Sequence, residues 1–277
     1  MKQLLITLSI IRPINIAISL LSIIVVMQIL MIFDLYQYIL ISTVISCYMS
    51  AGYILNDFLD IKIDAINKPN RVLVQKTISP YILIFTISLL FLLGSITAFF
   101  LPPLSTYIAV YIALPCIILY ELFFKKIALI GNIIISILIG LVFIFTEAAV
   151  TQSIGVTYKI MILASLLNLI REIIKDMQDQ VGDERYNFKT LPILIGVSHT
   201  IYILYFLSLI FVMVSCLLLY QSLSTYFLPL IFFTIHLPLL YINLGLTTNI
   251  SSKECAKFSK ILKLMIINGV LIILILS

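Results

Sequence analysis

The chain has 277 residues, of which 62% are hydrophobic and only 10% are charged, and its mean hydropathy is +1.23. Soluble globular domains contain about 25% charged and about 45–50% apolar residues, so this composition excludes that class. A membrane-spanning helix needs roughly 20 apolar residues, and uncharged stretches of that length recur along the chain. We therefore predict an all-α polytopic membrane protein with a single membrane domain covering residues 1–277.

Two of the uncharged stretches are long enough for two helices each. The stretch from Thr77 breaks at 101–103, which reads Leu-Pro-Pro, and the stretch from Thr190 breaks near Gln221–Thr225, where polar residues interrupt the apolar run. When apolar segments that also contain some charged or polar residues are added, nine transmembrane helices are predicted. They lie near 14–33, 37–55, 80–100, 104–120, 129–146, 159–175, 199–219, 225–244 and 258–276.

The basic residues test this topology. Threading the chain through nine spans puts sixteen of the seventeen Lys and Arg on one side, and only Lys159 on the other. By the positive-inside rule the N-terminus is cytoplasmic, and we expect a multi-pass protein of the cell membrane in contact with its lipids. The net charge of +5 then reflects topology, so neither nucleic acid nor an obligate protein partner is predicted. The four cysteines contain no CxxC pair and indicate no disulfide framework.

Two acidic motifs share the pattern DxxDxxxD, one within Asn56–Asp64 and the other over Asp176–Asp183. Each follows an even-numbered predicted span on the cytoplasmic side, and basic residues follow each motif. The repetition predicts a bundle of two pseudo-repeated halves that face one another. The six motif carboxylates belong to Asp57, Asp60, Asp64, Asp176, Asp179 and Asp183.

The spacing of the motifs indicates what they bind. On a helix, positions i, i+3 and i+7 share one face, so each motif aims three like charges in one direction. Charges near apolar spans are costly and need compensation, which divalent cations supply. Mg2+ takes oxygen ligands and is usually held by one or two carboxylates together with substrate phosphates. We therefore predict Mg2+ as cofactor and a diphosphate as ligand, with neighbouring Lys and Arg contacting the remaining phosphate oxygens.

Departure of the diphosphate from an allylic carbon would leave a delocalised cation, which an acceptor attacks in a pocket that excludes water. Two other interpretations remain open, namely solvated loop charges and an ion-coupled transporter. Half of the twelve acidic residues lie in the two motifs, and pathway carboxylates usually sit singly at mid-membrane. A CDP-alcohol phosphotransferase also uses clustered aspartates, but its DGxxAR element is absent here.

Four segments carry a resemblance to a known family. An RPxN element occupies Arg12–Asn15, and the first motif continues as NDFLDIKIDAINKPNR over Asn56–Arg71. A Tyr and basic segment, with Tyr120 and Lys125, precedes a Gly-Asn pair, and the second motif lies in REIIKDMQDQVGDERYNFKTLPILIG over Arg171–Gly196. In these features the chain resembles, over nearly its whole length, the UbiA superfamily of intramembrane prenyltransferases.

The REIIKD and KTLP elements resemble the branch that attaches a geranylgeranyl group to geranylgeranylglyceryl phosphate, so the resemblance implies a transferase acting in lipid biosynthesis. An aromatic acceptor such as a quinone precursor is the alternative, because Val72 and Asn187 stand where many relatives have proline and glycine. The resemblance assigns catalytic roles to Asp57, Asp60, Asp176, Asp179 and Lys125, and Mg2+ binding to Asp57, Asp60, Asp64, Asp176, Asp179 and Asp183. It also assigns diphosphate binding to Asn56, Arg71, Tyr120, Lys125, Arg171, Lys175 and Lys189, and places Arg12 and Asn15 on the acceptor side.

Overall fold

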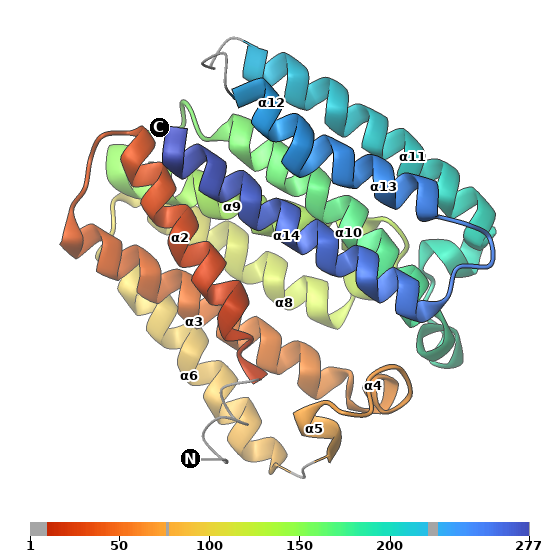
Figure 1. The fold of residues 1–277 in the computed structure, drawn as a ribbon. Coiled ribbons are helices and arrows are strands. Elements are labelled where there is room, and N and C mark those ends of the chain that lie inside the picture. The colour runs from red at the N-terminus through yellow and green to blue at the C-terminus, as the bar shows by residue number, and fades with distance from the viewer. Residues whose placement is uncertain (1–9, 76–77, 221–226, 277) are drawn as a thin grey trace. The chain divides into compact units, whose positions relative to one another are not determined.

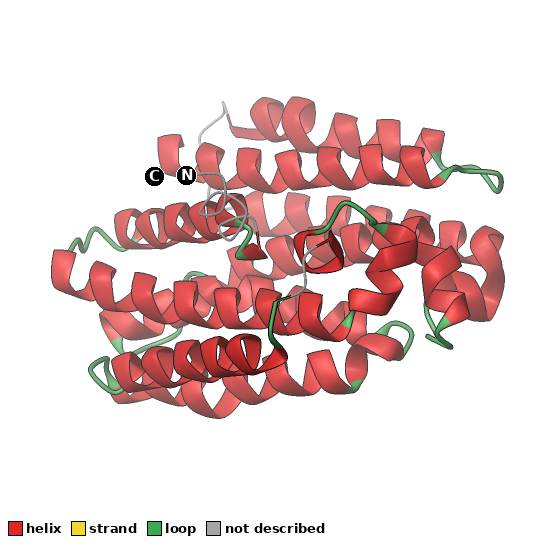
Figure 2. Ribbon diagram, turned by 90° about the horizontal axis from the view of Figure 1, so that it is seen from below, coloured by secondary structure: helices red, strands yellow, loops and turns green. Residues whose placement is uncertain are grey.

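A computed structural model describes residues 10–75, 78–220 and 227–276, and helices make up nearly all of this part of the chain (Figure 2). It contains no named strand, and the only β-type pairing among the described residues is an isolated bridge between Ile127 and Lys189. The all-α prediction is confirmed. The predicted break at Gln221–Thr225, and two of the counted lysines, Lys2 and Lys76, lie outside the described residues.

The main helices are coloured in chain order in Figure 1. They are α2 (Pro13–Ile29), α3 (Leu35–Leu59), α4 (Ile61–Asn67), α5 (Val72–Gln75), α6 (Pro80–Ala98), α7 (Pro103–Thr106), η1 (Tyr107–Ala113), α8 (Leu114–Leu122), η2 (Phe124–Lys126), α9 (Ile130–Thr151), α10 (Tyr158–Arg185), α11 (Leu191–Tyr220), α12 (Phe227–Ile231), η3 (Phe232–His236), α13 (Leu237–Gly245) and α14 (Ser252–Leu276).

Within the described residues, each predicted span lies largely on helical residues, although not all of these helices have the length and composition of a membrane span. In the described chain, six helices are long and apolar enough to cross a membrane, and Pro13–Ile29 and Pro229–Gly245 are shorter apolar helices. The predicted span 159–175 forms the first part of α10, and four of the nine charged residues of this helix lie within that span. The number of nine spans and the cytoplasmic N-terminus stay predictions.

Local sequence signals explain where several helices begin. Asp34 caps α3, because its carboxylate accepts hydrogen bonds from the backbone N–H groups of Tyr36 (2.8 Å) and Gln37 (3.4 Å). Ser251 and Glu254 form a reciprocal capping box at the start of α14, in which each side chain accepts from the backbone N–H of the other.

The described chain divides into two compact units. The first consists of residues 1–124 and 141–157, and the second of residues 125–140 and 158–277. In the first unit α3 packs mainly along α6, and in the second α10 packs along both α11 and α14. Each unit has its own apolar core, with Ile23, Ile41 and Ala148 in the first and Ile173, Leu204 and Leu262 in the second fully buried. This division supports the predicted two-part organisation.

A second internal repetition appears in the irregular helices. The π-helical segment η1 ends at Ala113, two residues before Pro115, and η3 ends at His236, two residues before Pro238. Proline lacks an N–H and its ring crowds the carbonyl four residues earlier, so a locally widened helix relieves the conflict. Since η1 lies in the first unit and η3 in the second, the pattern Ile-x-Leu-Pro occurs once in each unit. It agrees with the two pseudo-repeated halves that the aspartate motifs predict.

The contact between α3 and α6 depends on a glycine. A Cβ atom at Gly94 would lie 2.6 Å from Tyr48 Cε1 and 3.2 Å from Cys47 Cβ. Small residues permit this kind of close approach between membrane helices. The Tyr48 hydroxyl also hydrogen-bonds Ser95 Oγ at 2.9 Å, which fixes the ring over the glycine.

We predict that Gly94→Ala lowers the thermal stability of the detergent-solubilised protein, because overpacking a tight contact costs about 1–3 kcal/mol. Gly269→Ala is the matched control, since a Cβ there meets only Ile235 Cδ1 at 3.7 Å, an ordinary contact. The measurement is the monomeric fraction recovered by size-exclusion chromatography after heating. Equal melting of the two variants would contradict the packing role of Gly94.

Candidate functional site

The two aspartate motifs have the same spacing but different backbones. The first is not a single helix as predicted: α3 ends at Leu59, Asp60 has φ −96° and ψ 8°, and α4 begins at Ile61. Asp60 therefore occupies the bridge region between two helices, and Asp57 and Asp64 lie on separate segments. The second motif lies wholly within the continuous helix α10, as predicted.

In the first unit, two arginines neutralise the first motif. Arg12 Nη2 lies 2.6 Å from Asp57 Oδ1, and Arg71 Nη1 lies 2.9 Å from the same oxygen. Arg71 Nη1 also pairs with Asp64 Oδ2, so one guanidinium nitrogen joins two carboxylates. Both aspartates are buried, and burial raises the pKa of Asp64 above its ordinary value even though Arg71 and Lys68 act in the opposite direction.

The RPxN element carries Arg12 to the first motif. Arg12 has a left-handed backbone (φ 52°) immediately before Pro13, which opens α2. Its guanidinium lies 4.6 Å from the centroid of the Tyr53 ring, and Asn15 Nδ2 donates to the Tyr53 hydroxyl at 3.1 Å. The two residues predicted for the acceptor side are thus brought together with Asp57 by Tyr53, which sequence reasoning missed.

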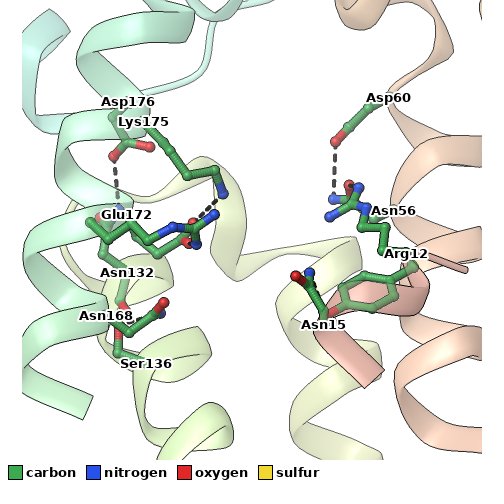
Figure 3. A network of polar contacts seen from close by, with 12 residues as sticks. Arg12, Asn15, Asn56, Asp60, Asn132, Ser136, Asn168, Glu172, Lys175 and Asp176 are labelled. Carbon is green, nitrogen blue, oxygen red and sulfur yellow. Dashed lines mark hydrogen bonds and ion pairs between the residues drawn. The ribbon is translucent and has the colours of Figure 1, made fainter. Parts of the chain in front are cut away.

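Asn56 is the centre of the same network (Figure 3). Its side-chain oxygen Oδ1 accepts from Arg12 Nη2 at 3.3 Å, and its side-chain nitrogen Nδ2 donates to Asp60 Oδ2 at 3.1 Å. That nitrogen also donates to Glu121 Oε2 at 3.0 Å. Glu121 is a second buried residue that the sequence did not single out, and it directly follows Tyr120, a predicted diphosphate ligand in α8.

In the second unit, an amide holds the second motif. Asn132 Nδ2 donates to Asp176 Oδ2 at 2.9 Å, and Asn132 Oδ1 accepts from the backbone N–H of Leu129 at 3.2 Å (Figure 3). Because Asn132 Oδ1 accepts from Leu129, the Nδ2 end of the amide is the one that faces the Asp176 carboxylate. Burial raises the pKa of Asp176 to about 8, Glu172 and Asp183 add to the rise, and Asn132 opposes it. A cation beside Asp176 would favour its ionised form.

Polar residues continue along α9 and α10 from this position. Asn168 Nδ2 donates to Ser136 Oγ at 3.3 Å, and Ser136 Oγ donates to the backbone carbonyl of Asn132 at 2.6 Å. Asn132 and Ser136 are four residues apart on α9, and Asn168 precedes Glu172 and Asp176 at the same spacing on α10. This i, i+4 periodicity was the available sequence signal for the three residues the prediction omitted, Ser136, Asn168 and Glu172.

The remaining predicted ligands of the second unit lie around the second motif and its C-terminal loop. The backbone N–H of Lys189 donates to the carbonyl of Lys126 at 3.0 Å, which brings the exposed Lys189 together with the segment that contains the half-buried Lys125. Asp183 is buried and Asp179 is half-buried on α10. Arg171 Nη1 lies 2.7 Å from Glu172 Oε1, and Lys175 Nζ lies 2.5 Å from Glu172 Oε2, so both cations pair with Glu172.

The fit of a metal ion can be judged from these contacts. Among the described residues, no group of three His, Cys, Asp or Glu side chains is arranged to hold a metal ion. The donors are nevertheless carboxylate oxygens, which suit Mg2+, and those of Asp57 and Asp64 already converge on one cationic nitrogen of Arg71. The oxygen chemistry therefore fits Mg2+, and the assignment of all six aspartates as ligands stays a prediction.

Comparison with known proteins gives consistent results. The profile of the UbiA prenyltransferase family matches residues 17–267. Digeranylgeranylglyceryl phosphate synthase from Methanosphaera stadtmanae is 32% identical over 216 residues, which cover 77% of this chain and 78% of the relative. A solved structure described as that synthase in membranes is 28% identical, with TM-score 0.77 and coverage of 99% and 98%. A UbiA homolog from Archaeoglobus fulgidus bound to DMAPP and Mg2+ is 18% identical, with TM-score 0.71 and coverage of 98% and 99%, and this likeness concerns the fold.

We predict that Asn132→Asp destabilises the protein, because it replaces a hydrogen bond to Asp176 with a second carboxylate. The loss should be on the order of 1–3 kcal/mol and should be larger near pH 9 than near pH 6, since at low pH one proton can be shared between the two carboxyls. The measurement is thermal unfolding in detergent at both pH values. Asn249→Asp, in an exposed turn, is the control, and a pH-independent loss would contradict the assignment.

Proposed function

This chain belongs to the UbiA prenyltransferase family, and we propose that it transfers a prenyl group from an allylic diphosphate to a hydroxyl of geranylgeranylglyceryl phosphate or a similar glycerophosphate lipid. The observation that carries the choice of acceptor is the similarity to the digeranylgeranylglyceryl phosphate synthase of Methanosphaera stadtmanae over more than three quarters of both chains. A transferred group of the geranylgeranyl type follows from the same similarity. The apolar helices agree with a multi-pass membrane protein, and we propose that its active site faces the cytoplasm.

Both aspartate motifs are proposed to bind Mg2+ and, with it, the prenyl diphosphate. When bound, Mg2+ would neutralise charge that develops on the departing diphosphate. Arg71 pairs with both Asp57 and Asp64. If these carboxylates held the metal, the Arg71 guanidinium would be suited to contact a phosphate oxygen. The other proposed diphosphate ligands are Asn56, Tyr120, Lys125, Arg171, Lys175 and Lys189.

The chemical step is a substitution at the allylic carbon. The bond between that carbon and the diphosphate oxygen breaks with its electron pair going to the diphosphate, which leaves an allylic cation. The acceptor hydroxyl oxygen then bonds to the carbon and loses its proton to water or to the released diphosphate. The residues of the chain hold the two substrates, neutralise the leaving group and exclude bulk water from the cation.

Arg12 and Asn15 are proposed to lie beside the acceptor. Arg12 contacts Asp57 at 2.6 Å and Tyr53 through its ring face, so its position depends on the same residues that carry the first motif. This coupling supports a role for the RPxN element in orienting the acceptor relative to the diphosphate, rather than only in anchoring the first helix at the membrane surface.

We predict that purified protein in detergent, given Mg2+ and labelled geranylgeranyl diphosphate, prenylates geranylgeranylglyceryl phosphate. EDTA, Asp57→Asn and Asp176→Asn should each lower the rate on the order of 100-fold or more, because each removes charge stabilisation of the leaving group. Asp34→Asn is the matched control, since asparagine caps the start of α3 as well as aspartate does.

Two results would reject parts of this proposal. Product formation that is unchanged by EDTA and by both substitutions would mean that the motifs do not bind a catalytic metal. Transfer to an aromatic quinone precursor, without transfer to any glycerophosphate lipid, would mean that the acceptor is wrong while the prenyltransferase activity stands.

A further inference from the structure

Two loops of the second unit, one before α9 and one between α10 and α11, are joined through their backbones. The backbone N–H of Lys189 donates to the carbonyl of Lys126 at 3.0 Å, and Ile127 and Lys189 form an isolated parallel bridge. The first loop carries Lys125 and the second carries Lys189, which are both proposed diphosphate ligands. The bridge therefore brings together the two segments that supply these cations.

A side-chain contact lies beside the bridge. Lys126 Nζ lies 5.6 Å from the centroid of the Phe188 ring, which is within the range of a cation–π interaction. Lys126 thus contacts the second loop through both its carbonyl and its ammonium. It ends the short 3-10 helix η2, in which consecutive side chains differ in direction by about 120°. Since Lys126 extends toward Phe188, the side chain of Lys125 extends in a different direction.

The end of α10 directs Phe188 to this contact. Asn187 has a left-handed backbone, with φ 56°. The backbone N–H of Phe188 donates to the carbonyl of Asp183 at 2.9 Å, and that of Asn187 donates to the carbonyl of Glu184 at 3.1 Å. These are the two bonds of a Schellman motif, which ends a helix at a residue of left-handed conformation. The position of Phe188 is therefore fixed relative to Asp183, the last acid of the second motif.

The first loop is also connected to the second motif at its other end. The backbone N–H of Leu129 donates to Asn132 Oδ1 at 3.2 Å, and Asn132 Nδ2 donates to Asp176 Oδ2 at 2.9 Å. The segment from Lys126 to Asn132 thus links the first acid of the motif to the turn that follows its last acid. Both loops and both ends of the motif belong to one set of connected contacts.

Lys126, Phe188 and Asn187 together form a loop clamp. We propose that this loop clamp holds Lys125 and Lys189 beside the second motif in position to contact the diphosphate. The inference rests on the proposed function, which places these two lysines at that ligand. Lys126 is then a positioning residue that does not touch the ligand. Loops that are held before the ligand arrives lose less conformational entropy when it binds, so the loop clamp increases affinity.

The first test measures the binding of inorganic diphosphate in the presence of Mg2+ by isothermal titration calorimetry. Lys126→Met and Phe188→Leu should each raise the Kd about two- to fivefold, which corresponds to the loss of one exposed cation–π contact. Lys126→Arg and Phe188→Tyr keep the cation and the ring, so both should bind like the wild type. Lys257→Met is the matched control, because Lys257 Nζ lies 5.3 Å from the centroid of the Tyr241 ring, away from the loop clamp.

A double variant distinguishes positioning from direct binding. If Lys126 acts through Phe188, Lys126→Met combined with Phe188→Leu should bind no more weakly than either single variant, since both remove the same contact. A larger rise in Kd for Lys126→Met than for Phe188→Leu, with losses that add in the double variant, would mean that Lys126 contacts the diphosphate directly and would overturn the inference.

The turn at Asn187 supplies an independent test. Asn187→Val should raise the Kd as Phe188→Leu does, because a β-branched residue disfavours the left-handed backbone, whereas Asn187→Gly should bind like the wild type. In the transfer reaction kcat/KM for geranylgeranyl diphosphate should fall by the same factor, while the KM for the lipid acceptor changes by less than about twofold. If Asn187→Val is not monodisperse, Asn187→Ala replaces it. An equal loss in Asn187→Gly, or an equal change for both substrates, would contradict the loop clamp.

The same titrations separate this inference from the proposed function. A wild type that does not bind diphosphate would reject the diphosphate site and the loop clamp together. A wild type that binds diphosphate, with a Kd that neither Lys126→Met nor Phe188→Leu changes, would reject the loop clamp alone. Binding that weakens as expected would support the loop clamp whichever acceptor the enzyme prenylates.

Discussion

The organisation of both units depends on one constraint, which is that carboxylates at the ends of apolar helices must be neutralised or hydrogen-bonded. In the first unit two arginines meet Asp57, and one of them also reaches Asp64. In the second unit the side-chain amide of Asn132 donates to Asp176. Arg171 and Lys175 pair with Glu172. Without such partners, burial would protonate the acids or exclude them from these positions. The polar networks are therefore a condition of the fold as well as a preparation for ligands.

The two motifs meet this constraint in different ways although their spacing is identical. In the first, the neutralising charges come from Arg12, which precedes α2, and from Arg71, which follows α4. In the second, the partner Asn132 comes from a different helix. The two motifs thus have the same spacing of acids but different supporting contacts.

Apolar length and the aspartate spacing were sufficient to predict the helical class and the two motifs, whereas the number of membrane spans stays a prediction. The end of α3 at Leu59 was not predictable, because no proline or glycine marks it and isoleucine, lysine and aspartate all occur in helices. Tyr53, Glu121 and Glu172 were also missed. A single polar residue in an apolar span looks the same in sequence whether it faces a partner helix or lipid, and only the packing distinguishes the two. Arg12 was predicted by resemblance, but its left-handed backbone depends on tertiary contacts.

The break at Asp60 has a consequence for how the two motifs can diverge. In a continuous helix, inserting one residue rotates everything that follows by about 100° around the axis, so a change of length within α10 would turn Asp179 and Asp183 away from Asp176. At Asp60 the chain already changes direction, and a following loop joins α4 to Arg71. An added or lost residue there can be absorbed locally. The first motif is therefore the one in which the spacing of the acids can drift over evolutionary time, while the second is held to its register by the geometry of the helix that carries it.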